Sequence, residues 1–133
     1  MVCILCDSKT KTSNSRSNSD HHQTWRRHTC KRCSAVFTTR ETIDMAISYR
    51  VEQVDGSIRP FSRDTLFLSV LEALKHRPSH IEDAAALTLT IISKVQSLRR
   101  LIIGRDELFE ISASVLRRYN IGVSQIYKSR HSK

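Results

Sequence analysis

The pattern of apolar and polar residues changes near residue 46 of the chain. From Ile47 to Glu52 apolar and polar residues alternate, and this period of two predicts a half-buried strand. Asp55-Gly56 predicts a tight turn, because glycine adopts a positive φ without steric cost, and residues 58–61 return as a second strand. The sequence therefore predicts a β-hairpin at the start of the longer, C-terminal part of the chain.

Three helices are predicted after this hairpin, because apolar residues recur there at helical spacing. Ser62 is the expected cap of the first helix, Ser79 and Glu82 form a capping box for the second, and Asp106 starts the third after a short strand over residues 101–104. The predicted buried residues are Phe67, Val70, Leu71 and Leu74, then Ile81, Ala84, Ala85, Ile91, Ile92, Val95 and Leu98, and finally Leu108, Ile111, Val115, Leu116 and Tyr119. The order of elements indicates an α+β fold.

The first 45 residues are polar and bury too little to fold alone. They hold all four cysteines of the chain, Cys3, Cys6, Cys30 and Cys33, in two pairs with two residues between the members of each pair. Each such turn aims two sulfurs at one ion, and two turns supply the four thiolates that structural zinc prefers. The spacing predicts a zinc ribbon with one Zn²⁺ per chain, whose site we expect Trp25 and Phe37 to cover.

Other chemistries use the same cysteine pattern. Disulfides need an oxidising compartment, and residues 1–7 have neither the basic start nor the apolar run of a signal peptide. A thioredoxin-like redox centre needs one pair beside a βαβ pattern, whereas here two pairs flank a polar loop. A rubredoxin-like iron site has the same four thiolates, so the ligands alone leave iron open.

The chain carries a formal net charge of +9, which favours a polyanionic partner. Cations gather in and beside the loop that the cysteines close, and a basic loop held rigid by a metal is suited to phosphates and base edges of double-stranded DNA. The candidate DNA-binding residues are Arg16, Arg26, Arg27, His28, Lys31 and Arg32. A ribbon that holds a partner protein, with its charges solvated, is the competing interpretation.

Several function classes are disfavoured by the sequence. No nucleophile–base–acid arrangement, paired carboxylates or phosphate-binding GxxxxGK[ST] loop stands out, so we do not expect an enzyme. No apolar run approaches the ~20 residues of a membrane span, and a cytoplasmic protein is expected.

The ordered motifs resemble the bacterial NrdR regulators, which combine a zinc ribbon with an ATP-cone domain. The ribbon part of the resemblance lies in Cys3-Ile4-Leu5-Cys6, Asn14-Ser15-Arg16, residues 26–33 and Phe37-Thr38-Thr39-Arg40-Glu41, and the cone part lies in Val51, Asp55-Gly56, Pro60-Phe61, Leu66 and residues 74–78. The resemblance implies a DNA-binding zinc ribbon over residues 1–45 and a nucleotide-sensing, oligomer-forming cone over residues 46–133. It further implies a homo-oligomeric repressor of ribonucleotide reductase genes, regulated by ATP and dATP.

The nucleotide site implied by the resemblance comprises Val51, Gln53, Val54, Asp55, Thr65, Arg77 and Tyr127. The family usually has two adjacent cations where this chain has Gln53-Val54, and a lysine where it has Thr65. Arg50, Arg59, Arg63 and Arg77 are candidates to replace the missing charges. The alternative function is a protein-interaction module with a degenerate cone that binds neither DNA nor nucleotide usefully.

Overall fold

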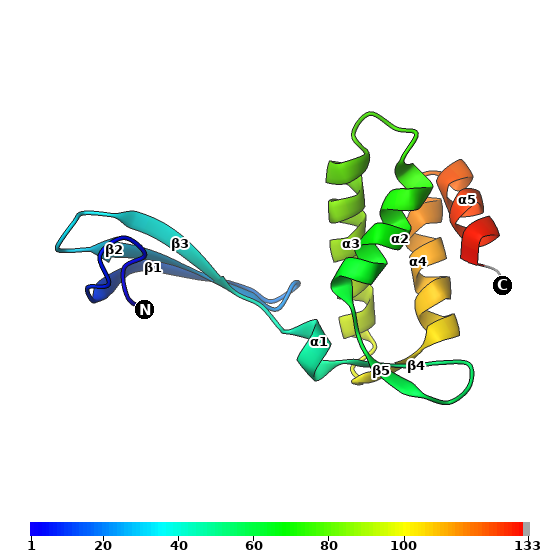
Figure 1. Ribbon diagram of the computed structural model, residues 1–133, viewed down its shortest axis with the longest axis horizontal. Helices are drawn as coiled ribbons and strands as arrows, with labels where there is room; N and C mark the ends of the chain where they lie inside the picture. The colour runs from blue at the N-terminus through cyan, green and yellow to red at the C-terminus, as the bar shows by residue number, and fades with distance from the viewer. Residues whose placement is uncertain (132–133) are drawn as a thin grey trace. The chain divides into compact units, whose positions relative to one another are not determined.

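The computed structural model describes residues 1–131 of the chain, and these form two compact units whose boundary along the chain falls between Ile43 and Asp44. The first unit is an antiparallel sheet of three strands in the order β1-β2-β3 (Figure 1). The strands are β1 (Thr10–Asn18), β2 (Gln23–Cys30) and β3 (Val36–Glu41). Almost every residue of β1 is exposed, so pairing with β2 rather than a hydrophobic core holds this polar segment extended.

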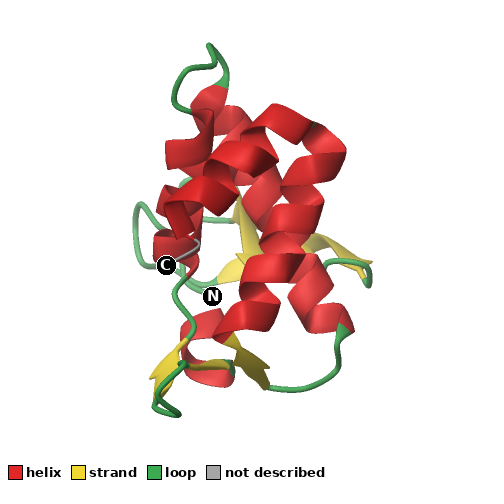
Figure 2. Ribbon diagram, turned by 90° about the vertical axis from the view of Figure 1, so that its right-hand side faces the viewer, coloured by secondary structure: helices red, strands yellow, loops and turns green. Residues whose placement is uncertain are grey.

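The second unit combines a small sheet with helices. The sheet has the order β5-β4-β6, in which β4 (Arg50–Glu52) pairs antiparallel with β5 (Ile58–Pro60) and parallel with β6 (Ile102–Gly104). Its helices are α1 (Met45–Ser48), α2 (Arg63–Leu74), α3 (His80–Ser97), α4 (Arg105–Tyr119) and α5 (Ile121–His131). The β4–β5 hairpin lies at one end of the packed helices (Figures 1 and 2). The predicted α+β fold is confirmed.

The hydrophobic core lies in the second unit and joins its helices to its sheet. Val51 and Ile103 are buried on adjacent strands, and side chains from all five helices of the described chain complete the core. The fully buried residues include Phe61, Val70, Leu74, Ile91, Val95, Leu116 and Val123. Each of these side chains stabilises the fold by about 1.5–3 kcal/mol through removal of apolar surface from water.

The hairpin differs from the prediction at its start. Ile47 lies in α1 and its side chain is 73% exposed, so the predicted strand begins three residues later, at Arg50. Asp44 caps this helical turn by accepting a hydrogen bond from the Ile47 N–H, and the Arg50 guanidinium donates to the carbonyl oxygen of Ala46. These local hydrogen bonds outweigh the alternating pattern.

Three details of the predicted helices are also wrong. Ile81 is 55% exposed and Ala85 is exposed. The buried stripe of α3 is therefore narrower than the one predicted from its apolar residues. The capping box is absent, because the Ser79 hydroxyl donates to the Asp83 carboxylate at 2.6 Å instead of capping the backbone. Tyr119 is 37% exposed rather than buried.

A further helix, α5, was not predicted. It packs against α4 and α2 and buries Val123, Ser124 and Tyr127. The buried Ser124 hydroxyl donates to the carbonyl oxygen of Ala113 at 2.9 Å, which satisfies its hydrogen-bonding capacity. Among residues 1–131, no helix has the length and apolar character needed to cross a bilayer.

Candidate functional site

The two cysteine turns have the same backbone geometry. The Cys3 N–H donates to the Ser8 carbonyl oxygen at 2.8 Å, and the Cys30 N–H donates to the Ala35 carbonyl oxygen at 2.9 Å. Each first cysteine is therefore bonded to the residue five positions later. Cys3 and Cys30 are the buried members of the two pairs.

The residue after each second cysteine closes its turn in the left-handed region. The N–H of Asp7 donates to the Cys3 carbonyl oxygen at 3.1 Å, and the N–H of Ser34 donates to the Cys30 carbonyl oxygen at 3.0 Å. Their φ angles are 57° and 61°, a conformation that is uncommon for residues other than glycine. Two separate segments thus adopt the same strained turn conformation, and the cysteine sulfurs of the two turns point toward one another.

The four sulfur atoms lie within 4.8 Å of one another. Cys3 Sγ is 3.5 Å from Cys33 Sγ, and Cys6 Sγ is 3.6 Å from Cys30 Sγ. A tetrahedron of thiolates about 2.3 Å from a central ion has edges of about 3.8 Å, whereas a disulfide needs about 2.05 Å. The cysteines are free, and their geometry fits one metal ion and not two disulfides.

The thiols of the second turn differ in acidity. A backbone hydrogen bond from Cys33 lowers the pKa of Cys30 to about 6, against the opposing effect of burial. A backbone hydrogen bond from Ala35 alone would lower the pKa of Cys33, but contact with the Cys3 thiol and loss of hydration outweigh it and raise the pKa to about 12. Thiolates packed this closely need a cation among them, which is the charge that a bound metal supplies.

The predicted aromatic cover of the metal site is partly wrong. Trp25 lies five positions before Cys30 on β2, its ring is 46% exposed, and the Arg40 guanidinium lies 5.0 Å from the ring centroid. Phe37 is half-buried and stacks on His28, with 5.2 Å between the ring centroids. The two rings therefore contact different residues of the ribbon, Arg40 in the case of Trp25 and His28 in the case of Phe37.

The ribbon sheet has two chemically different faces, because successive side chains of a strand point to opposite sides and paired residues share a side. The cationic face is the side that carries Lys11, Arg16, Trp25, Arg27 and Arg40. On it Trp25 pairs with both Arg16 and Arg40, and Arg27 pairs with Asn14 and Thr38. Within residues 10–41 no acidic residue of the strands points to this side, since Glu41 is paired with Thr24 on the other.

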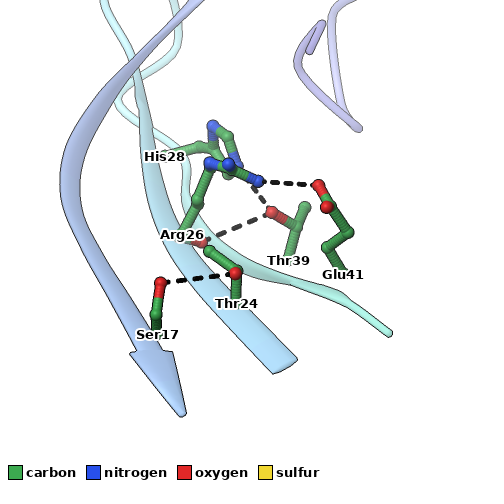
Figure 3. A network of polar contacts seen from close by, with 6 residues as sticks. All are labelled: Ser17, Thr24, Arg26, His28, Thr39 and Glu41. Carbon is green, nitrogen blue, oxygen red and sulfur yellow. Dashed lines mark hydrogen bonds and ion pairs between the residues drawn. The ribbon is translucent and has the colours of Figure 1, made fainter. Parts of the chain in front are cut away.

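On the opposite face, charged and polar side chains of the ribbon contact one another in a network (Figure 3). Arg26 forms an ion pair with Glu41 at 3.1 Å. His28, which is only 4% exposed, has its Nε2 2.7 Å from Thr39 Oγ1. Arg26 and His28 on this face are thus engaged by contacts within the ribbon.

The predicted DNA-binding residues are divided between these surfaces. Arg16 and Arg27 lie on the cationic face, whereas Arg26 and His28 belong to the opposite network. Lys31 and Arg32 are exposed in the second cysteine turn, where the Arg32 guanidinium donates to Ser8 Oγ at 3.4 Å. Lys11 and Arg40 were missed by the sequence reasoning, because only the strand register shows that they share a side with Arg16.

The second unit contains a cleft of about 810 Å³ between the hairpin, the start of α2, the start of α4 and the end of α5. Five of the seven predicted nucleotide-binding residues line it: Val51, Gln53, Val54, Thr65 and Tyr127. Arg59, Arg105 and His131 line it as well, together with the acidic Asp106 and Glu110. Arg59 was among the cations proposed as replacements. Arg105 and His131 were missed because they lie far along the chain from the hairpin, at the start of α4 and at the end of α5.

An aromatic group forms one wall of this cleft. The Tyr127 ring stacks on Phe109 with centroids 5.6 Å apart, and His131 lies 4.4 Å from Tyr127. Burial, together with the nearby charges of Arg105 and Arg130, lowers the pKa of His131. The cleft lining therefore combines the half-buried Phe109 ring, stacked on the buried Tyr127, with the guanidinium groups of Arg59 and Arg105 and the carboxylates of Asp106 and Glu110.

Two predicted nucleotide-binding residues are engaged elsewhere. Asp55 accepts hydrogen bonds from the Ser57 hydroxyl at 2.6 Å and the Ser57 N–H at 3.0 Å, which lower its pKa and fix the hairpin turn. The Arg77 guanidinium lies 5.2 Å from the ring centroid of Tyr119, at the α2–α3 end of the unit. Neither residue is part of the cleft lining in the described chain.

A four-cysteine centre closing a three-stranded sheet, joined to a helical unit with a cleft lined by charged residues, defines a two-part protein with an N-terminal zinc-ribbon fold. Residues 1–41 match the sequence model described as "Transcriptional repressor NrdR-like, N-terminal domain". The chain is 31% identical to the transcriptional repressor NrdR of Psychrobacter arcticus over 118 residues, covering 88% of this chain and 77% of the relative. For the protein of the same name from Bifidobacterium longum, the identity is 32% over 109 residues, covering 81% and 72%.

The chain therefore belongs to the NrdR family. The similarity extends well beyond the ribbon into the second unit, since the family model ends at residue 41 and the relatives align over more than 100 residues. The resemblance inferred from the motifs is confirmed.

Proposed function

We propose that this protein is a zinc-dependent, DNA-binding repressor of ribonucleotide reductase genes, regulated by ATP and dATP. The observation that supports it most directly is the cationic face, a sheet surface with four basic side chains and no acid, on a ribbon closed by four cysteines. Membership of a family whose relatives are named transcriptional repressors supports the same function.

Zinc is the proposed ion, with one Zn²⁺ held by Cys3, Cys6, Cys30 and Cys33. Four thiolates in a closed tetrahedral set are a structural zinc site, in which no position is left open for substrate. The role of the ion is to fold the ribbon, because β1 is a polar strand that buries little apolar surface.

Double-stranded promoter DNA is the proposed partner of the cationic face. Lys11, Arg16, Arg27 and Arg40 neutralise backbone phosphates, and the release of condensed counterions supplies affinity that does not depend on sequence. Arginine side chains can add specificity, because a guanidinium pairs in a bidentate manner with guanine in the major groove. The exposed Lys31 and Arg32 extend the basic surface into the second cysteine turn.

The nucleotide is proposed to bind in the cleft of the second unit. Arg59 and Arg105 supply charge for the phosphates, while the half-buried Phe109, stacked on the buried Tyr127, supplies aromatic surface for the base. In this arrangement Arg59 and Arg105 take the place of the cations that the family usually has where this chain has Gln53, Val54 and Thr65. ATP and dATP regulate DNA binding only if they bind unequally to the forms that do and do not bind DNA, and a homo-oligomer provides such forms.

The protein acts in the cytoplasm without catalysing a reaction, since both proposed sites bind a ligand and neither is arranged for bond breaking. The test is fluorescence anisotropy with labelled promoter DNA from the ribonucleotide reductase operon of the same genome. The affinity should fall steeply with salt and should differ between ATP and dATP. A protein that holds zinc but has no affinity for this DNA at low salt would instead be a protein-interaction module.

A further inference from the structure

One row of the cationic face contains an aromatic side chain between two arginines. Trp25 on the central strand pairs with Arg16 on β1 and with Arg40 on β3, so the three side chains lie side by side across the sheet. Neighbouring strands are about 4.8 Å apart, which places the two arginines roughly 10 Å apart with the indole between them.

The indole lies outside the hydrophobic core of the described residues. Trp25 is 46% exposed on a solvent-facing side of the sheet, and its described ring contact is the Arg40 guanidinium at 5.0 Å. A guanidinium over one side of the ring holds the indole in place and leaves its remaining surface accessible. Arg16 and Arg40 form no ion pair within residues 1–131, so both charges are available to a ligand.

We propose that this row binds an unstacked base of a single-stranded nucleic acid. In this arrangement the base stacks on Trp25, and Arg16 and Arg40 hold the phosphates on either side of it. The proposal rests on the nucleic-acid binding proposed above for the same face and adds a ligand to it, namely single strands.

A single strand fits the row better than a duplex does. Bases of a duplex already cover one another's flat surfaces, so the exposed indole of Trp25 can stack only on a base that is unstacked from its neighbours. Aromatic side chains on an open sheet, flanked by cations that follow the backbone, are the means by which proteins bind unpaired bases without sequence preference.

Trp25 is the only tryptophan of the chain, so its fluorescence reports on this row directly. Titration of the zinc-loaded, full-length protein with a short oligothymidylate should quench the fluorescence, because stacking brings a base against the indole. Inorganic polyphosphate supplies the charge without bases and should bind with little quenching. Equal quenching by polyphosphate, or by a blunt duplex of the same length, would overturn the proposal.

Variants separate the ring from the charges. Trp25→Leu should weaken binding of a labelled oligothymidylate about tenfold or more, since stacking of one base contributes on that scale, and Trp25→Phe should restore most of the affinity. Arg26→Ala, on the opposite face, is the matched control and should change little. Zinc content and circular dichroism establish that each variant is folded.

The outcome for single strands is distinguishable from the outcome for the proposed function. Wild-type protein that binds promoter duplex but shows neither quenching nor affinity for oligothymidylate overturns only the single-strand proposal. Wild-type protein that binds neither nucleic acid overturns both.

Discussion

The Tyr119 hydroxyl donates a 2.7 Å hydrogen bond to the Asp83 carboxylate and thereby joins the end of α4 to the first turn of α3. The Ser79 hydroxyl donates to the same carboxylate oxygen at 2.6 Å, and the Arg77 guanidinium lies over the Tyr119 ring. Four residues from three segments thus form one polar cluster at the end of the unit where α2 meets α3.

The Tyr119→Phe variant should lower the melting temperature of the second unit by a few degrees at neutral pH. Hydrogen bonds from Ser79 and Tyr119 hold the pKa of Asp83 below its ordinary value, so the ionised carboxylate is the form that stabilises the fold. This contribution is fully present above the ordinary carboxyl pKa and is lost as the pH falls through the lowered pKa. Thermal unfolding followed across pH 2–7 should show the two proteins converging at the acid end. A constant difference would contradict the assignment to Asp83.

Replacing Ser34 with glycine should stabilise the ribbon. Ser34 has a φ of 61°, and a left-handed conformation costs an ordinary residue about 1 kcal/mol that glycine does not incur. We therefore expect Ser34→Gly to hold zinc more tightly in competition with a chromophoric chelator. Ala35→Gly is the control one position later, outside the set of positive φ angles, and should weaken the ribbon or leave it unchanged.

Removal of the metal should unfold the first unit and spare the second. The strands of the ribbon have few buried apolar residues, whereas the second unit has its own hydrophobic core. A strong chelator, or the Cys33→Ser variant, should abolish the protection of β1–β3 amides in hydrogen exchange while the core of α2–α4 stays protected. Loss of protection in both units together would show that the second unit depends on the ribbon.

Arg27→Ala and Arg26→Ala should differ in their effect on duplex DNA binding, although the two residues are adjacent. Arg27 lies on the cationic face, and its loss should weaken promoter binding and reduce the slope of log affinity against log salt by about 1. Arg26 is paired with Glu41 on the other face, so its loss should leave the slope unchanged. Equal slopes for both variants would contradict the separation of the faces.

Arg105→Ala should weaken nucleotide binding, because Arg105 lines the cleft and supplies charge for phosphates. A charge-assisted contact contributes about 1.5–3 kcal/mol, which corresponds to a loss of roughly tenfold or more in affinity. Isothermal titration with ATP measures the change. Arg77→Ala is the matched control, since Arg77 lies over Tyr119 and outside the cleft, and its affinity should equal that of the unaltered protein.

The sequence predicted that the four cysteines come together, because each pair with two intervening residues forms a local turn and the chain has no other cysteines. It could not sort Arg26 from Arg27, because their difference depends on the side of β2 that each occupies and on the position of Glu41 on β3. The basic groups of the cleft were harder still, since Arg59 and Arg105 are 46 positions apart and meet only through the packing of α4 against the small sheet.

Local hydrogen bonds and tertiary packing account for the errors in the predicted fold. Ile47 fits a strand by alternation, but the Asp44 cap and the Arg50 guanidinium close a helical turn around it. The α5 segment begins with Ile121-Gly122 and contains few apolar residues, so its periodicity is weak. It is helical because Val123 and Tyr127 are buried against α2 and α4. This stabilisation comes from distant parts of the chain and cannot be predicted from the local sequence.

Only Thr42 and Ile43 separate the last residue of β3 from the Asp44 cap of α1. Two extended residues span roughly 7 Å, so the tether between the units is short compared with a turn of DNA. The short tether therefore limits how far a ribbon can reach from the start of its own helical unit. In the proposed homo-oligomer, the way the helical units associate would therefore limit the distance between ribbons, and with it the spacing of the DNA sites that they can occupy together.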